Sequence, residues 1–344
     1  AVRALGIPSV LVAQGKSVEL LPARHEAFRY YPTPEEVLAD IETPAALVTS
    51  FCEGESYGRA LTSFLKGRCP TMAHLDFWSA PFQLGTPWSR GVHQPDDVLV
   101  SDQYGRMCAE VGWRGGSDHI VELGFPALDD VIVIDQAAMR REIREHLGIP
   151  MDAFAVLVAG QDEGSAEVLE SVAGAITHVR GARSGRPIVL IPREHPRMRK
   201  EWGEEAVRWD AACALLGGSP SVVDGSKPDA TALIAASDTV ISWCSTMLIT
   251  AAALQRFPIA WQPPVYFARY RALAGGALDE FPLVAMGCGW KAMTKSELVE
   301  LLTRAYDGDA SLRSAQEREL RLDGKNAERV AAFVRERIAD FRSS

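Results

Sequence analysis

Of the 344 residues in the sequence, 47% are hydrophobic and 24% are charged, a composition that is ordinary for a soluble globular protein. The chain is too long for one typical hydrophobic core, so we expect two domains. Its 36 basic and 45 acidic residues give a net charge of −9. This charge argues against a nucleic-acid binder, because such proteins neutralise phosphates with a basic domain or stripe. Any anion site in this chain must therefore be local.

The six cysteines have no CxxC spacing, so the sequence predicts neither a zinc site nor a disulfide framework, and a reducing cytoplasm fits best. No apolar run approaches the roughly 18 residues of a membrane span, so we expect no integral membrane segment. The opening, AVRALGIPSVLVA, is typical of the end of a helix that runs into a strand. We therefore expect a strand upstream to be missing from the printed chain.

Residues 1–130 predict an α/β domain with long loops. The patterns PEEVLADI and GRALTSFLK are helical, and the insert FWSAPFQLGTPWSRGVHQPDD has the proline, glycine and aromatic content of a loop. The strand candidates are, in chain order, IPSVLVA, PAALVTS, PTMAHLD, DDVLVSD and HIVELGFP.

Residues 131–152 predict a connection with a charged helix, and residues 153–325 predict a second domain. There, near-continuous apolar strands alternate with helical segments, which indicates a parallel sheet covered on both faces. A capping box of Thr294 and Glu297 opens one late helix, and residues 326–344 predict a final helix. The expected strands are AFAVLVAG, PIVLIP, SVVD, TVISW and PIAWQ, and the expected helices include SAEVLESVAGAITHV, DATALIAAS and TMLITAAALQ.

In an open parallel sheet, ligands bind outside the carboxyl ends of the strands, where the strand order reverses. A doubly wound order places the loops after the first and fourth strands of the second domain, GQDEGS and CSTM, on either side of that point. Ser245 and Thr246 lie where the strand TVISW ends and the helix TMLITAAALQ begins. The free amides and the dipole at the start of that helix favour phosphate. Ser245 as a simple N-cap explains the same pattern equally well.

The segment PIVLIPREHPRMRK gathers basic side chains at the end of a strand. Pro196 restricts the backbone of His195 to an extended loop conformation. We interpret His195, with Arg193 or Arg197, as a phosphate site. The alternative is a solvated basic turn, which we favour for Arg199 and Lys200.

The QDEG stretch follows the first strand of the second domain. Glu163 is a candidate general base, but Asp162 and Glu163 also suit the first turn of a helix, where acidic side chains are stabilising. We expect Gly160 and Gly164 to let a ligand approach the backbone, with Gln161 beside it.

In the first domain, Asp76 ends a strand and precedes Phe77 and Trp78. A carboxylate beside aromatic rings that can stack on a sugar is a candidate general base. An N-cap or a loop salt bridge explains Asp76 equally well. The FCEGES turn, residues 51–56, is either an acceptor-binding turn or plain turn chemistry.

Taken in order, several of these segments resemble the GT-B glycosyltransferase superfamily and its relatives, the UDP-sugar 2-epimerases and the CDP-glycerol and CMP-sugar transferases. HIVELGFPALDDV is similar to the interdomain turn of that family and FAVLVAGQDEG to the opening of its nucleotide domain. PREHPR resembles a His-Pro motif of bacterial transferases, and ASDTVISWCSTMLITAAALQRFPIAW resembles the donor-phosphate segment. The resemblance implies an α/β fold of two Rossmann-like domains that face each other across a cleft.

The resemblance also implies a function. It makes His195, Ser245 and Thr246 ligands of the donor phosphate in a glycosyltransferase, with Asp76 or Glu163 taking the proton of an acceptor hydroxyl. The family's glutamate after the Ser-Thr turn is absent, since Met247 to Thr250 follow. Because an epimerase would usually carry that glutamate, we rank the first alternative, a UDP-sugar 2-epimerase, below a transferase. The same absence keeps open the second alternative, a non-catalytic nucleotide-sugar-binding protein.

The expected partners are a nucleotide-sugar donor and a hydroxyl-bearing acceptor, with no nucleic acid. No DxD-like metal site is evident and no cofactor is expected. Peripheral membrane contact and a homo-oligomer stay open.

Overall fold

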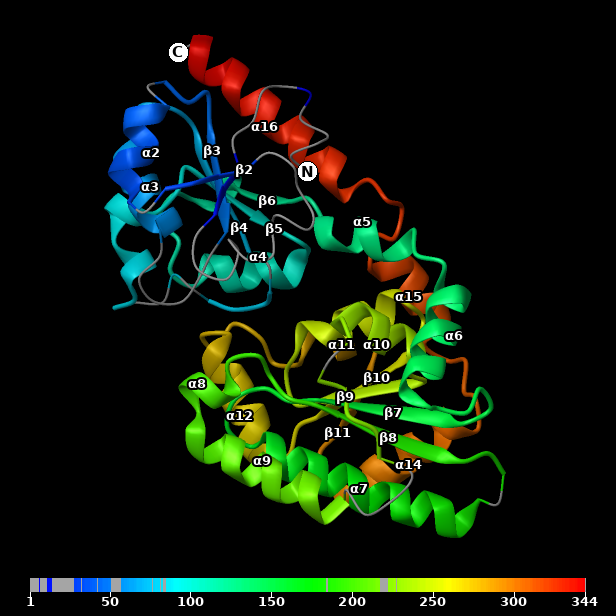
Figure 1. Ribbon diagram of the computed structural model, residues 1–344. Coiled ribbons are helices and arrows are strands. Elements are labelled where there is room, and N and C mark those ends of the chain that lie inside the picture. The colour runs from blue at the N-terminus through cyan, green and yellow to red at the C-terminus, as the bar shows by residue number, and fades with distance from the viewer. Residues whose placement is uncertain are drawn as a thin grey trace. The chain divides into compact units, whose positions relative to one another are not determined.

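We describe the protein from a computed structural model (Figure 1). Two compact units make up the chain: Ala1–Ala127, Leu273–Leu278 and Lys325–Ser344 form unit 1, and Leu128–Ala272 and Asp279–Gly324 form unit 2. The structure describes residues 6, 11–13, 28–31, 33–41, 43–50, 57–75, 77–80, 82, 85–183, 185–216, 222–226 and 228–343.

Unit 2 is built on a five-stranded parallel sheet with the order β11-β10-β9-β7-β8. Val222 adds an isolated parallel bridge to Leu190 of β8, so SVVD, which was expected to be a strand, contributes one bridge at this edge. With that edge counted, the order reverses between the first and fourth strand-forming segments, as the sequence predicts. The strands are β7 (Phe154–Ala159), β8 (Ile188–Arg193), β9 (Thr239–Ser242), β10 (Phe257–Trp261) and β11 (Trp290–Ala292).

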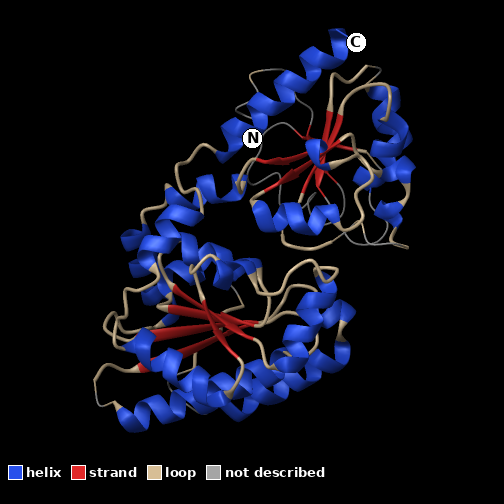
Figure 2. Cartoon of the chain, turned by 180° about the vertical axis from the view of Figure 1, so that it is seen from behind, coloured by secondary structure: helices blue, strands red, loops and turns tan. Residues whose placement is uncertain are grey.

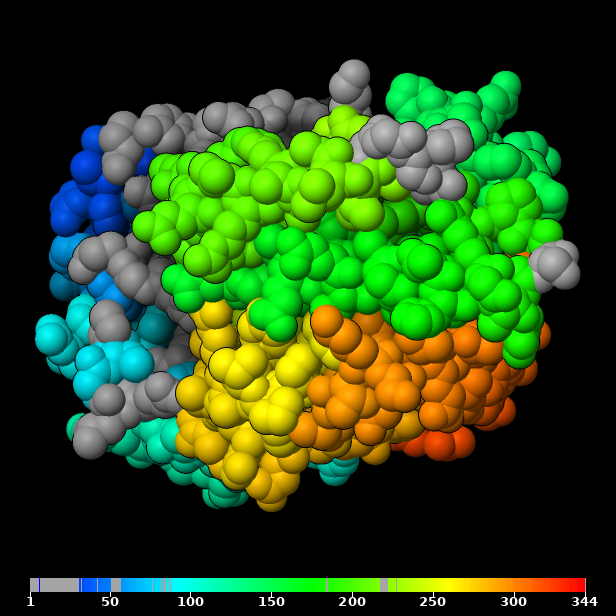
Figure 3. Space-filling model, turned by 90° about the horizontal axis from the view of Figure 1, so that it is seen from below, coloured from blue at the N-terminus to red at the C-terminus, as the bar shows by residue number. Residues whose placement is uncertain are grey.

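Helices cover both faces of this sheet (Figures 1 and 2). All six residues of β7 are buried, because a central parallel strand packs against helices on both sides. Figure 3 shows α7 and α9 in green beside α12 in yellow and α14 in orange. The expected capping box of Thr294 and Glu297 is present. The helices of unit 2 include α7 (Ser165–Ala182), α8 (Met198–Glu201), α9 (Gly203–Leu216), α10 (Ala230–Ala236), α11 (Thr246–Ala253), α13 (Pro282–Ala285), α14 (Lys295–Tyr306) and α15 (Arg313–Glu319), and most of α12 (Pro264–Leu273).

The segment expected to be a connection, residues 131–152, lies within unit 2 and is tied to its sheet. It contains α6 (Gln136–Leu147), whose Arg144 is fully buried. Arg144 Nη2 and Arg140 Nη2 donate to the two carboxylate oxygens of Asp238, at 2.9 and 2.8 Å. Burial lowers the pKa of Arg144, and Asp238 opposes that shift. A buried charge is tolerated here because its remaining donors reach backbone carbonyls, including that of Ala236.

Unit 1 contains a four-stranded parallel sheet, β3-β4-β5-β6, and a separate parallel pair, β1-β2. Four of its five expected strands give this sheet and the fifth gives β1, whereas β2 was not expected. The strands are β1 (Leu11–Ala13), β2 (Phe28–Tyr30), β3 (Leu47–Ser50), β4 (Thr71–His74), β5 (Asp97–Val100) and β6 (Ile120–Glu122).

The last helix, α16 (Asn326–Ser343), packs on this first sheet rather than standing apart. Its Val330, Val334 and Ile338 join a buried cluster with Met72 and Leu99. The helix α16 therefore belongs to the core of unit 1. Its other helices are α2 (Pro34–Asp40), α3 (Tyr57–Leu65), α4 (Gln103–Glu110) and the short turns η2 (Pro87–Ser89), η3 (Gly91–His93) and η4 (Ser117–His119), while α5 (Pro126–Ile132) leads into unit 2.

Candidate functional site

The carboxyl ends of β7, β8 and β9 bring three loops to one edge of the unit 2 sheet. Residues 160–164, 194–197 and 243–245 follow these adjacent strands. Ser242 Oγ donates to the carbonyl of Ala159, at 2.8 Å, and ties β9 to β7 where the strand order reverses. Two helices, α7 and α11, begin at this edge.

The start of α7 is occupied by the protein's own groups. Glu205 Oε1 accepts a hydrogen bond from the Ala166 amide, at 2.7 Å, and Glu205 is only 3% exposed. Ser165 Oγ accepts from the Gln161 amide, also at 2.7 Å. A buried carboxylate thus already supplies the anion that the N-terminus of α7 favours.

The start of α11 is arranged differently. Ser245 caps the helix, because its Oγ accepts from the Met247 amide at 3.2 Å and its carbonyl accepts from Leu248. Ser245 is buried, whereas Thr246 is exposed. Within the described residues, no carboxylate is bonded to this first turn. The N-terminus of α11 therefore keeps its capacity for an external anion.

Gly160 makes the loops after β7 and β8 approach each other closely. Its amide donates to the Arg193 carbonyl at 2.8 Å. A Cβ atom there would lie 3.1 Å from that carbonyl oxygen and 3.3 Å from the His195 nitrogen. The absence of a side chain at Gly160 thus allows the loop after β8 to pack closely, and the approach of a ligand to the Gly160 backbone stays a prediction.

Gly164 has a left-handed φ of 92°, and a Cβ atom there would collide with the Tyr266 hydroxyl. The Tyr266 hydroxyl, which donates to Glu167 at 2.7 Å, occupies the space that a side chain at position 164 would need, and the approach of a ligand to the Gly164 backbone stays a prediction. Burial raises the pKa of Tyr266. This phenol is therefore a hydrogen-bond donor and not a base at neutral pH.

His195 is held by its own turn and by an aromatic neighbour. Its Nδ1 accepts from the Arg197 amide at 3.2 Å, and its carbonyl accepts from Met198 at 2.9 Å. The centroid of the imidazole ring lies 5.3 Å from that of the Trp202 ring. Since Nδ1 accepts, Nε2 carries the proton of the neutral ring and is its donor.

The two arginines expected beside His195 have partners within the protein. Arg193 Nη1 donates to the carbonyls of Gly225 and Pro228, at 2.8 and 2.6 Å, and burial lowers the pKa of Arg193. Arg197 pairs with Glu201 at 3.2 Å and lies over the ring of Trp202. Their role as phosphate ligands stays a prediction.

The acidic pair after β7 meets an arginine that the sequence reasoning missed. Arg269 Nη2 donates to Asp162 Oδ2 at 2.7 Å and lies over the Trp243 ring, 5.4 Å from its centroid. Burial raises the pKa of Asp162, and Arg269 opposes the shift. Glu163 is 74% exposed, 3.7 Å from Arg269, so its expected role as a base stays a prediction.

Arg269 and Glu205 were missed because each lies more than 35 residues from the loop that it contacts. For Arg269, the local signal is the helical spacing that places Tyr266, Arg269 and Tyr270 near one face of α12. Cys244, next to Ser245, is not a nucleophile candidate, because burial raises the pKa of its thiol.

In unit 1, Asp76 and residues 51–56 lie outside the described residues. The expectation of stacking rings beside Asp76 is wrong for Trp78, which is fully buried and donates from Nε1 to both Asp102 oxygens, at 3.0 and 2.9 Å. Phe82 and Trp88 are also buried. The aromatic insert thus fills the core of unit 1 with these three rings.

Among the described residues, no group of three or more histidine, cysteine, aspartate or glutamate side chains is placed to hold a metal ion. None of the described helices is long and apolar enough to cross a membrane.

Comparison with solved structures decides the fold. A glycosyltransferase from Rickettsia africae aligns over 99% of this chain and 91% of its own, with a TM-score of 0.63 at 11% identity. The UDP-GlcNAc 2-epimerase of Methanocaldococcus jannaschii aligns over 97% and 94%, with a TM-score of 0.65 at 13% identity. The chain has a GT-B fold.

The GT-B fold confirms the expected architecture of Rossmann-like α/β domains. Anabaena HepE in complex with UDP shares the fold, with a TM-score of 0.59 at 14% identity over 97% of this chain and 91% of its own. No protein-family model matches the chain.

Part of the sequence is also similar to two curated transferases. The chain is 32% identical over 101 residues to a UDP-N-acetylglucosamine--N-acetylmuramyl-(pentapeptide) pyrophosphoryl-undecaprenol N-acetylglucosamine transferase from Rhodococcus jostii, and 31% identical to the Rhodococcus opacus enzyme. The match spans 24% of this chain and 26% of each relative. The chain thus matches about a quarter of the length of these curated relatives.

Proposed function

We propose that this chain is a glycosyltransferase that moves a sugar from a nucleotide-sugar donor to an acceptor hydroxyl without a metal ion. The observation that carries the proposal is the contrast between the two helix starts at the strand-order reversal. The N-terminus of α7 is filled by Glu205, whereas that of α11 is capped by Ser245 alone among the described residues. A donor phosphate is the ligand that such a helix start favours.

In this proposal the donor phosphate binds the first amides of α11, Ser245 and Thr246, with His195 donating from Nε2. The bond between the anomeric carbon and the phosphate oxygen breaks, and its electron pair stays on the phosphate. The acceptor oxygen forms the new bond to that carbon and gives its proton to a carboxylate, for which Asp76 is the first candidate and Glu163 the second. Hydrogen-bond donors aimed at the departing oxygen would stabilise its developing charge.

UDP is the first nucleotide to test, because the similar Anabaena structure contains UDP and the similar epimerase and transferase are named for UDP-linked sugars. We propose the cytoplasm as the place of reaction. This proposal rests on the cysteines, because the five that the structure describes are all free thiols.

The test is thermal stabilisation by a panel of UDP, CDP, CMP, GDP and TDP, because a ligand that binds only the folded state raises its stability. We expect one nucleotide to raise the Tm of the wild type and of His178→Ala, an exposed histidine on α7 used as a control, but not of His195→Ala. If every nucleotide leaves the wild-type Tm unchanged, the proposal fails.

A UDP-sugar 2-epimerase is the second candidate, because the M. jannaschii epimerase shares the fold. It needs no acceptor. Inversion at sugar C2 in donor alone, followed by proton NMR, would replace the transferase proposal with this one. Nucleotide-sugar binding with neither inversion nor transfer would favour a non-catalytic binding protein.

A further inference from the structure

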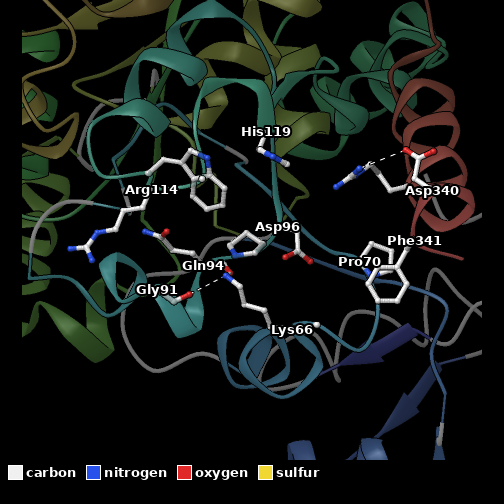
Figure 4. Close-up of a pocket in the computed structure, with 14 residues that line it drawn as sticks. Lys66, Pro70, Gly91, Gln94, Asp96, Arg114, His119, Asp340 and Phe341 are labelled. Atoms are coloured by element: carbon white, nitrogen blue, oxygen red, sulfur yellow. Dashed lines mark hydrogen bonds and ion pairs between the residues drawn. The ribbon is translucent and has the colours of Figure 1, made fainter. Parts of the chain in front are cut away.

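Unit 1 contains a cavity of about 610 Å³ at the edge of its sheet where the strands begin (Figure 4). Pro70 directly precedes β4, Asp96 precedes β5 and His119 precedes β6. The carboxyl ends of the same strands, where the acceptor is proposed to bind, lie at the opposite edge of the sheet. The cavity is therefore separate from the proposed reaction site.

Among the described residues, two cationic side chains that line this cavity, Lys66 and Arg114, have no carboxylate partner. Lys66 Nζ donates to the carbonyls of Gly91 and Gln94, at 3.0 and 2.7 Å. These bonds hold the ammonium in place but leave its charge uncompensated. Arg114 has no hydrogen bond or ion pair with any residue that the structure describes, and it lies at one end of the group of side chains in Figure 4.

A third cation in the cavity wall is held by a buried carboxylate. Asp97, with a side chain 3% exposed, accepts from Arg337 Nε at 2.7 Å and from His119 Nδ1 at 3.0 Å. Asp97 thus fixes side chains from α16 and from the start of β6 in the same wall. Arg337 Nη1 also lies 3.7 Å from a carboxylate oxygen of Asp340, whose side chain is 60% exposed.

One acidic group of the cavity, Asp96, is already hydrogen-bonded within the protein. Asp96 Oδ2 accepts from both the amide and the hydroxyl of Thr71, at 2.9 and 2.8 Å. Asp340 and Phe341 lie together on α16, at the other end of the group from Arg114 (Figure 4). The cavity therefore presents donors from Lys66, Arg114 and Arg337 in a chain whose net charge is −9.

We propose that this cavity is a second binding site, for a sugar-sized ligand that bears a phosphate or a carboxylate group. Its volume lies within the range of small-molecule pockets, roughly 300–1,000 Å³, and exceeds what a bare phosphate needs. Trp113 supplies an apolar wall, with its Nε1 fixed to the Gly116 carbonyl at 3.0 Å. Arginine and lysine donors are the groups that recognise phosphate and carboxylate oxygens. The site does not depend on the proposed transferase activity.

The test measures binding of glucose 1-phosphate, glucuronate and glucose by fluorine NMR of protein labelled with 5-fluorotryptophan, with the Trp113 signal assigned from Trp113→Phe. We expect glucose 1-phosphate, glucuronate or both to shift the Trp113 signal, and glucose to leave it unchanged. A shift from both sugars means that either anionic group is accepted, and a shift from one names the group.

The variants Arg114→Ala and Lys66→Met should each weaken that binding roughly tenfold or more, the loss expected for one charge-assisted hydrogen bond. Arg68→Ala, an exposed arginine outside the cavity wall, is the matched control and should bind as the wild type does. His195→Ala should also leave the Trp113 shift intact, which separates this site from the proposed donor site. The proposal is overturned if both anionic sugars leave the Trp113 signal unmoved, or if Arg114→Ala and Lys66→Met both bind as tightly as the wild type does.

Discussion

The carboxylate of Glu205 on α9 accepts a hydrogen bond from the main-chain amide of Ala166 at the start of α7, with 2.7 Å between Oε1 and N. Glu205 thus caps a helix 39 residues before it in the chain. Glu205→Ala should lower the free energy of unfolding by about 1–3 kcal/mol, because it leaves a buried amide without an acceptor. Urea unfolding measures this change. The neighbouring exposed Glu204→Ala should stay close to the wild type, and an equal loss in both variants would show that the cap is not responsible.

Gly160→Ala should weaken nucleotide binding. Its new methyl group would press on the Arg193 carbonyl and the His195 amide, which are backbone atoms and cannot rotate away. We expect the His195 turn to shift and the nucleotide-dependent rise in Tm to shrink. Gly174→Ala, on an open face of α7, is the control. It should be stabilised by about 0.5–1 kcal/mol and keep its nucleotide response.

Arg144→Met should destabilise unit 2 strongly. It removes the fully buried guanidinium that pairs with Asp238 and also bonds several carbonyls, so those acceptors lose their donors. Loss of one partner from such a buried pair costs about 3–5 kcal/mol. Chemical denaturation with a probe in unit 2 measures the loss. Arg141→Met, exposed on the same helix, should change stability little, and a similar loss there would point to α6 rather than to the ion pair.

Asp162 should make stability depend on pH. Burial raises the pKa of this carboxyl above 3.8 in the folded protein, so the folded state binds the proton more tightly than the unfolded state does. This contribution is complete below a pH of about 4 and is lost as pH rises through the folded pKa. The free energy of unfolding of the wild type should therefore fall as pH rises from about 4 through the folded pKa of Asp162, and Asp162→Asn should remove that fall. Unfolding free energies measured at pH values from about 4 to 7 check this, with the exposed Asp152→Asn as control. Parallel profiles for the wild type and Asp162→Asn would contradict the prediction.

Much of the fold of unit 2 could be predicted from its sequence, because each apolar strand there is buried on both faces and stands out as a continuous run. The strand-order reversal between β7 and β9 also followed from the doubly wound pattern. β11 was missed, since three residues give too short a pattern. In unit 1, β2 is equally short, and the aromatic insert has the composition of a loop although Trp78, Phe82 and Trp88 are core residues.

The candidate site was predictable only where its residues are local. Ser245 and His195 each follow a strand, so their places at the sheet edge could be foreseen. The pairing of Asp162 with Arg269, and of Arg193 with the carbonyls of Gly225 and Pro228, depends on segments distant in sequence. The periodic pattern of apolar residues in a sequence does not predict which distant side chains will pair.

Because α16 packs on the sheet of unit 1, the core of that unit can be completed only after the rest of the chain has been synthesised. Arg337 lies 240 positions after its partner Asp97, and the whole of unit 2 lies between them in the sequence. On the ribosome, unit 2 is therefore synthesised in full before the partner of Asp97 exists. Until α16 emerges, the apolar surface around Met72 and Leu99 lacks its cover, and apolar surface exposed in this way favours aggregation of a nascent chain.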